Sequence, residues 1–231
     1  MTQDKELKIK NLFTSFSILN SHYYLANPHL SIYQKHPEQS METFLQTLRQ
    51  MIRISDEEIL IFIQKCERRQ YVRKAFLSEP GKVPHEVFFI LSGLLRVMVT
   101  DREGNEHTVH FALENQFIAD YSAFIQGRPA YYALQALEPL EVLVLPRAAI
   151  EWGYQHLAEG EKLGRLIAEY YFIYQDHRLQ NQYVRNPKER YDSIGEVFPN
   201  IHNRVPQHMI ASYLGITPEF LSKIRKDLSK K

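Results

Sequence analysis

Cysteine is nearly absent from this sequence, with Cys66 alone among 231 residues. One thiol cannot form an intrachain disulfide, and alone it cannot hold a zinc site or an iron–sulfur cluster. Long apolar runs are also missing, since the longest, Val87 to Leu95, contains Ser92 and Gly93 and is too short to span a bilayer. The first ten residues lack the apolar segment of a signal peptide. We therefore expect a cytoplasmic protein with no membrane contact.

An excess of charge of either sign is missing as well, because the net charge is +1. This balance neither supports nor excludes a nucleic-acid partner, since a basic patch can be local. The chain has no glycine-rich phosphate loop and no HExxH or GxSxG motif. We expect no enzymatic activity, no metal centre and no cofactor.

Two helices are predicted near the start of the folded part. Met41 to Ile54 carries apolar residues at helical spacing. Ser55 has the character of an N-cap for a second helix that continues to Cys66, with three acidic residues in its first turn.

Beyond Gln70 the apolar period changes to two, which predicts short β-strands separated by turns such as Pro80-Gly81. Many short strands with regular turns indicate a sandwich or a rolled barrel. The predicted strands are Tyr71–Leu77, Glu86–Leu91, Leu94–Thr100, His107–Phe111, Ala133–Leu137 and Leu140–Leu145.

A long helix is predicted from Ala158 to Val184, and its length of about 40 Å exceeds what a small domain needs to cover itself. One stripe on it has the three-and-four spacing of a coiled-coil seam, which predicts a homodimer. The alternative is that this stripe packs against its own β-domain. The seam residues are Leu163, Leu166, Tyr170, Ile173 and His177.

The C-terminal segment has the pattern of a helix-turn-helix. Pro206 precedes a helix from Gln207 to Leu214, Gly215 suits a left-handed turn, and Thr217 caps a helix that ends near Leu228. Aliphatic and small residues stand where two crossing helices require them. We predict that this segment binds double-stranded DNA.

Local charge supports this prediction, since six basic residues against two acidic ones give the segment from Ile201 onward a net +4. The second helix is expected in the major groove, with Glu219 accepting from cytosine and Lys223 donating to guanine. The predicted DNA-contacting residues are Arg204, Gln207, His208, Ser212, Thr217, Pro218, Glu219, Ser222, Lys223 and Lys226.

The order of these parts, together with the segments Val87–Val97 and Val205–Lys226, resembles the Crp/Fnr (cyclic-AMP-receptor-like) family of transcription regulators, especially its Bacteroidetes branch. The resemblance implies an α+β fold in which a cyclic-nucleotide-binding-like β-roll, a dimerisation helix and a winged-helix-like helix-turn-helix domain follow one another. It also implies a homodimer that binds a near-palindromic operator and RNA polymerase. The corresponding boundaries are 1–40 for an N-terminal extension, 41–157 for the sensor domain, 158–185 for the dimerisation helix and 186–231 for the DNA-binding domain.

The sequence departs from that family at the nucleotide pocket. Where the family keeps Gly-Glu and Arg-Ser for ribose and phosphate, this chain has Ala119-Asp120 and Ala130-Tyr131. A buried phosphate without its arginine loses a charge-assisted partner, so cyclic AMP is not the expected effector. The nearby residues fill the core or line a pocket for an apolar or aromatic effector. They are Phe117, Asp120, Tyr121, Phe124, Arg128, Tyr131 and Tyr132.

Two other functions stay open at this point. One is a small-molecule sensor whose main activity is ligand binding, and the other is a dimeric scaffold without a ligand. Titration with cyclic nucleotides and selection of bound DNA separate these from a DNA-binding regulator.

Overall fold

The computed structural model of the chain describes residues 37–228. Residues 1–36 of the predicted N-terminal extension lie outside this range, and its last four residues begin helix α2 (Pro37–Met51). Helix α3 (Asp56–Ile63) starts at the predicted cap, where Ser55 and Glu58 form a reciprocal capping box. The helix ends before Cys66, whose Sγ donates to the carbonyl oxygen of Phe62 at 3.4 Å.

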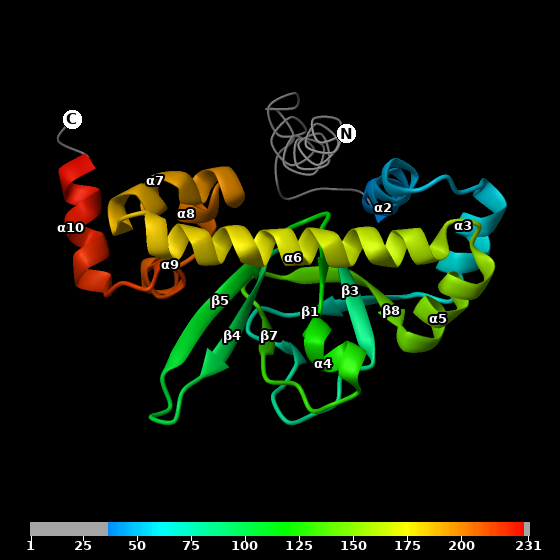
Figure 1. Ribbon diagram of the computed structural model, residues 1–231, viewed down its shortest axis with the longest axis horizontal. Helices are drawn as coiled ribbons and strands as arrows, with labels where there is room; N and C mark the ends of the chain where they lie inside the picture. Colours follow the sequence, from blue (N-terminus) through cyan, green and yellow to red (C-terminus); the bar gives the residue numbers. More distant parts are fainter. Residues whose placement is uncertain (1–36, 229–231) are drawn as a thin grey trace.

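Two antiparallel four-stranded sheets form a β-roll that encloses a core of aliphatic side chains (Figure 1). The first sheet has the order β1 (Glu67–Tyr71), β8 (Leu140–Pro146), β3 (Glu86–Ser92) and β6 (Phe117–Ile118). The second has the order β2 (Phe76–Ser78), β7 (Ala133–Ala136), β4 (Leu95–Thr100) and β5 (Glu106–Ala112). The predicted sandwich is confirmed.

One predicted strand, Tyr71–Leu77, is wrong because the chain changes sheet inside it. Lys74 takes a left-handed conformation with φ of 72°, which breaks the extended backbone. The residues before it pair with β8, and those after it pair with β7.

Two helices beside the roll were not predicted. Helix α4 (Tyr121–Gln126) is capped by Asp120 and ends at Gly127, whose φ is +61°. Helix α5 (Arg147–His156) follows β8 directly. Six residues are too few to show a helical period, and α5 continues from a strand without a turn signal.

Helix α6 (Gly160–Val184) runs along the roll from α5 to the C-terminal helices (Figure 1), within two residues of the predicted start. Glycines permit its close crossing with α5. A Cβ on Gly160 would lie 2.0 Å from the carbonyl oxygen of Gly153, and one on Gly164 would lie 2.6 Å from the Tyr154 ring. The long helix is thereby held against α5, which follows the last strand of the β-roll.

The C-terminal region is helical throughout its described part, with α7 (Pro187–Val197), α8 (Ile201–Arg204), α9 (Gln207–Leu214) and α10 (Pro218–Leu228). The predicted α9 and α10 are confirmed, while the single turn of α8 was not predicted. Within residues 37–228, no helix is both long enough and apolar enough to cross a membrane.

Candidate nucleic-acid interface and sensor site

Helices α9 and α10 cross through a small buried contact that fixes their relative orientation. Gly215 turns the chain with φ of +67°, and the N–H of Ile216 donates to the carbonyl oxygen of Ala211 at 3.0 Å. Thr217 Oγ1 accepts from the N–H of Phe220 at 3.2 Å and so caps α10. The buried side chains between the helices are Ile210, Ala211, Leu214, Leu221 and Ile224.

The outer face of α10 is polar and exposed, and α10 forms one end of the molecule (Figure 1). Hydrogen bonds from its own N–H and from the Thr217 hydroxyl lower the pKa of Glu219, so this side chain is an ionised acceptor. The predicted DNA-contacting residues that the structure leaves exposed are His208, Thr217, Pro218, Glu219, Ser222, Lys223 and Lys226.

Two further predicted contact residues of α9 face the protein, because α9 packs against β5. Ser212 Oγ accepts from the N–H of Thr108 at 2.9 Å. Gln207 is half-buried, and its Oε1 has no hydrogen-bond partner among the described residues. In this conformation Ser212 Oγ is bonded to β5 and Gln207 Oε1 is buried, so neither atom is placed to hold a DNA backbone as predicted.

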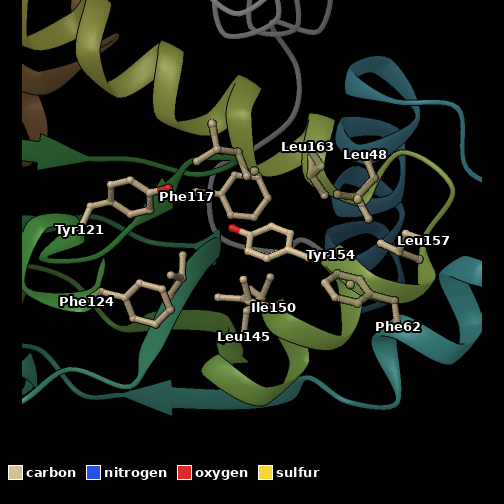
Figure 2. Close-up of a pocket in the computed structure, with 15 residues that line it drawn as sticks. Leu48, Phe62, Phe117, Tyr121, Phe124, Leu145, Ile150, Tyr154, Leu157 and Leu163 are labelled. Carbon is tan, nitrogen blue, oxygen red and sulfur yellow. The ribbon is translucent and has the colours of Figure 1, made fainter. Parts of the chain in front are cut away.

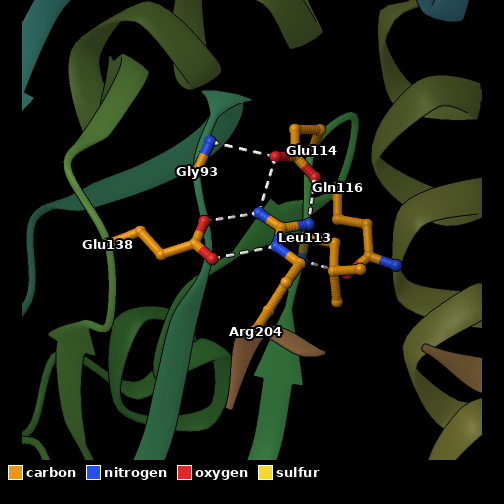
Figure 3. Close-up of polar contacts among 6 residues, drawn as sticks. All are labelled: Gly93, Leu113, Glu114, Gln116, Glu138 and Arg204. Carbon is orange, nitrogen blue, oxygen red and sulfur yellow. Dashed lines mark hydrogen bonds and ion pairs between the residues drawn. The ribbon is translucent and has the colours of Figure 1, made fainter. Parts of the chain in front are cut away.

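Arg204 also departs from its predicted role as a phosphate contact. Its guanidinium donates to Glu114 at 3.0 and 2.8 Å and to Glu138 at 3.0 and 2.6 Å (Figure 3). Glu114 additionally accepts from the N–H of Gly93 at 3.1 Å. Because the Arg204 side chain is 12% exposed and holds two carboxylates, it joins the helix-turn-helix domain to the β-roll instead.

A second junction links β5, α6 and α9. His110 Nδ1 lies 2.8 Å from the Tyr174 hydroxyl, which lies 3.1 Å from the Tyr213 hydroxyl. Burial, with a smaller contribution from nearby Arg178, lowers the pKa of His110 to about 3. The imidazole is therefore neutral at physiological pH, and β5, α6 and α9 share one largely buried chain of polar groups.

The predicted dimer seam on α6 is largely turned toward its own chain. Leu163 is buried in the core, and Leu166, Tyr170 and Ile173 are half-buried, whereas His177 is exposed. Burial raises the pKa of Tyr170. The alternative, in which this stripe packs against its own β-domain, thus describes the N-terminal part of the stripe.

A different stripe of large apolar side chains on α6 is exposed. Phe172, Leu179 and Tyr183 are 73%, 54% and 84% exposed. Phe172 lies about 160° around the helix from Tyr174, which packs on the protein's own core.

The segment that corresponds to the nucleotide-phosphate cassette holds a carboxylate of its own. Asp120 is 3% exposed. Its oxygens accept from the N–H groups of Ala123 at 3.1 Å, Tyr131 at 2.9 Å and Tyr132 at 3.1 Å. These three N–H groups are thereby already hydrogen-bonded to a side chain of the protein itself.

A partly open cavity of about 50 Å³ lies where α4, α5 and α6 meet the first sheet (Figure 2). Of the predicted pocket residues, Phe117, Tyr121 and Phe124 line it. The rest of its wall was missed because α2, α3, β8, α5 and α6 meet here only in the tertiary fold. It includes Leu48, Phe62, Leu145, Ile150, Tyr154, Leu157, Leu163, Gly164 and Ile167.

The other predicted pocket residues lie elsewhere. Asp120 caps α4, and Arg128 is exposed and donates to Ser122 Oγ at 3.0 Å. Tyr131 is 68% exposed, and Tyr132 packs on the core of the roll.

Comparison with known proteins identifies one family model and several solved structures that are similar to this chain. Residues 68–156 match the family model of the cyclic nucleotide-binding domain. Comparison of the sequence with curated proteins found no significant match.

Several solved structures share the fold. The c-di-GMP responsive global regulator CLP of Xanthomonas campestris superposes with a TM-score of 0.59 at 14% identity, over 74% of this chain and 90% of that one. FixK2 from Bradyrhizobium japonicum gives 0.61 at 15% identity, over 71% and 85%. A CooA mutant from Carboxydothermus hydrogenoformans gives 0.57 at 17% identity, over 78% and 88%. The chain has the fold of Crp/Fnr-type regulators.

Proposed function

We propose that this protein is a homodimeric, sequence-specific DNA-binding transcription regulator. The observation that carries the proposal is the exposed polar face of α10 on a capped helix-turn-helix. In the major groove, Lys223 would donate to guanine and Glu219 would accept from a cytosine amino group. Thr217, Ser222 and Lys226 would contact phosphates and fix the register.

The exposed stripe Phe172, Leu179 and Tyr183 supports dimerisation through α6. Its steps of seven and four residues suit a coiled-coil contact between two copies of the helix. A two-fold axis there would present two α10 helices on one side, with half-sites one helical turn apart. We propose this stripe as the dimer contact in place of the seam predicted from spacing alone.

We propose further that the β-roll takes no cyclic nucleotide. The Asp120 carboxylate already accepts the N–H groups of Tyr131 and Tyr132, and Ala130 stands where the family keeps its arginine. A phosphate there would meet a buried carboxylate without a compensating cation. Isothermal titration with cyclic AMP and cyclic GMP should show no binding, and a micromolar affinity for either would refute this part.

The proposed function is tested by selection of bound duplexes from a random library with the full-length protein. We expect an enriched palindrome whose half-sites lie about 10 base pairs apart. A variant with Lys223→Glu and Lys226→Glu should select nothing, while Arg102→Ala, an exposed change in the β4–β5 turn, should select the same site. The absence of a palindrome, or the same palindrome from the double variant, would overturn the proposal.

A sensor whose main activity is ligand binding is the second candidate, and the cavity beside α6 favours it. The two functions can be tested independently, because ligand binding is measurable without DNA.

A further inference from the structure

Helix α10 carries a large apolar side chain that the fold leaves uncovered. Phe220 is 44% exposed, whereas Leu221 and Ile224 of the same helix are 1% and 6% exposed. Single exposed apolar residues are common on protein surfaces, so the position of the ring on the helix has to show what covers it. A phenyl ring gains free energy from any partner that removes it from water.

Phe220 lies in the first turn of α10, at the border of the polar face. It is the third residue of the helix, and its N–H donates to Thr217 Oγ1 at 3.2 Å, which fixes the backbone at this point. At about 100° per residue, Phe220 lies about 60° around the helix from Lys223 and about 100° from Leu221. Side chains three residues apart are neighbours on a helix surface. The ring therefore adjoins the side chains proposed to read bases, in the half of the helix that contacts base edges.

The major groove offers this ring one matching chemical group. Guanine, cytosine and adenine present hydrogen-bond donors and acceptors there, while thymine adds a C5 methyl group to its O4 acceptor. A contact between phenyl and methyl removes apolar surface of both partners from water. Over an amino or carbonyl group, the same ring would displace water and offer no hydrogen bond in return. The chemistry of the ring thus selects thymine.

From its exposure and its place on the helix we infer that Phe220 is a specificity-determining residue, which contacts the C5 methyl of one thymine in each half-site. The inference rests on the proposed function and deepens it, because hydrogen bonds from Glu219 and Lys223 do not detect a methyl group. Three residues span about 4.5 Å along a helix, and bases along one strand are about 3.4 Å apart. The thymine should therefore lie within two base pairs of the guanine that Lys223 is proposed to contact.

The test exchanges thymine for deoxyuridine, one position at a time, in the duplex that the full-length protein selects. Deoxyuridine keeps the hydrogen-bonding groups of thymine and lacks only the methyl. At one position of the half-site, this exchange should weaken binding by the wild-type protein about fourfold, which is the factor that corresponds to burial of one carbon group. The exchange in both half-sites should weaken binding about fifteenfold. Fluorescence anisotropy at one fixed salt concentration measures the affinities.

A variant without the ring connects the methyl effect to Phe220. Phe220→Ala should bind the thymine and the deoxyuridine duplexes equally, and its preference for guanine at the Lys223 position should stay as in the wild type. The matched control is Phe76→Ala on β2, which removes a phenyl ring that is 42% exposed and should keep the fourfold ratio. Circular dichroism checks that both variants fold. The comparison of the two duplexes with the wild-type protein decides even if a variant does not fold.

Each unfavourable result has a definite meaning. Equal wild-type affinity for the two duplexes at every thymine position refutes the inference, and so does a methyl effect that persists in Phe220→Ala. A selected palindrome with no thymine within two base pairs of the guanine refutes it as well. All three results leave the proposed function in place, whereas a protein that selects no duplex overturns both.

Discussion

Arg204 of α8 donates two hydrogen bonds to Glu114, across 90 residues of sequence, with lengths of 3.0 and 2.8 Å. Glu138 shares the same guanidinium, so one cation serves two carboxylates from separate loops of the β-roll. All three side chains are mostly buried. Paired buried charges of this kind stabilise a structure little in net terms, but removal of one partner is costly. The cluster therefore fixes where the C-terminal helical region lies against the β-roll.

Arg204→Ala should lower the free energy of unfolding by about 3 kcal/mol, because it leaves two carboxylates buried without their cation. Urea denaturation of the full-length protein measures this change. The matched control is Arg49→Ala, which removes an exposed ion pair with Asp56 and should cost at most about 1 kcal/mol. Equal losses in the two variants would contradict the buried role of Arg204.

The same residue shows how far the sequence alone could be interpreted. A basic side chain beside a helix-turn-helix predicts a phosphate contact, and the two carboxylates that hold it come from loops 90 and 66 residues away. Helices α9 and α10 were predictable because their signals are local: Thr217 caps, Gly215 turns, and aliphatic residues repeat at helical spacing. Partners that only the tertiary fold brings together leave no local signal.

The dimer seam illustrates a second limit. Spacing on α6 permits the stripe through Leu166 and Ile173 and also the stripe through Phe172 and Leu179. Only the packing of α6 on its own roll decides which of them remains exposed. The cavity beside α6 was half-predictable for a similar reason, since Phe117, Tyr121 and Phe124 were among the predicted pocket residues but Tyr154 belongs to an unpredicted helix.

His110 should make stability depend on pH. Its pKa is about 3 in the folded protein, whereas an unfolded histidine has a pKa of about 6.5. The unfolded state therefore binds a proton first, so the stabilisation is complete above pH 6.5 and is lost as the pH falls toward 3. Between these two pH values the free energy of unfolding decreases by up to about 1.4 kcal/mol per pH unit. Urea unfolding at pH 6.5, 5.5 and 4.5 measures it.

The comparison variant for this dependence is His110→Gln, which removes the titrating group, so its stability should fall less steeply over the same range. Carboxylates contribute equally to both proteins and cancel. His156→Gln, which changes an exposed histidine, should retain the full wild-type slope. If the stabilities of His110→Gln and of the wild type decrease equally steeply with falling pH, His110 is not the group responsible for the pH dependence.

Two single changes on α6 test the proposed dimer and the stripe through which it forms. Leu179→Asp places a charge in the exposed apolar stripe and should shift the protein from dimer to monomer, because the buried charge would lack a partner. His177→Asp places the same charge on the seam predicted from spacing, and should leave the dimer intact. Sedimentation velocity at micromolar concentration measures both. A dimer that survives Leu179→Asp and dissociates with His177→Asp would place the dimer contact on the stripe that contains His177.

Lys223 and Lys226 lie on the exposed face of α10 and should affect DNA binding in different ways. Lys223→Ala should relax the preference for guanine at one position of each half-site, at a cost of about 1–3 kcal/mol for the preferred sequence. Lys226→Ala should weaken all sequences alike and reduce the slope of log affinity against log salt by about 1, since a phosphate contact releases counterions without distinguishing bases. Fluorescence anisotropy on the selected site and on its single-base variants, at three salt concentrations, separates the two effects. Equal losses across all sequences for both variants would show that α10 contacts only the backbone through these lysines, and would move sequence recognition to Glu219 and Ser222.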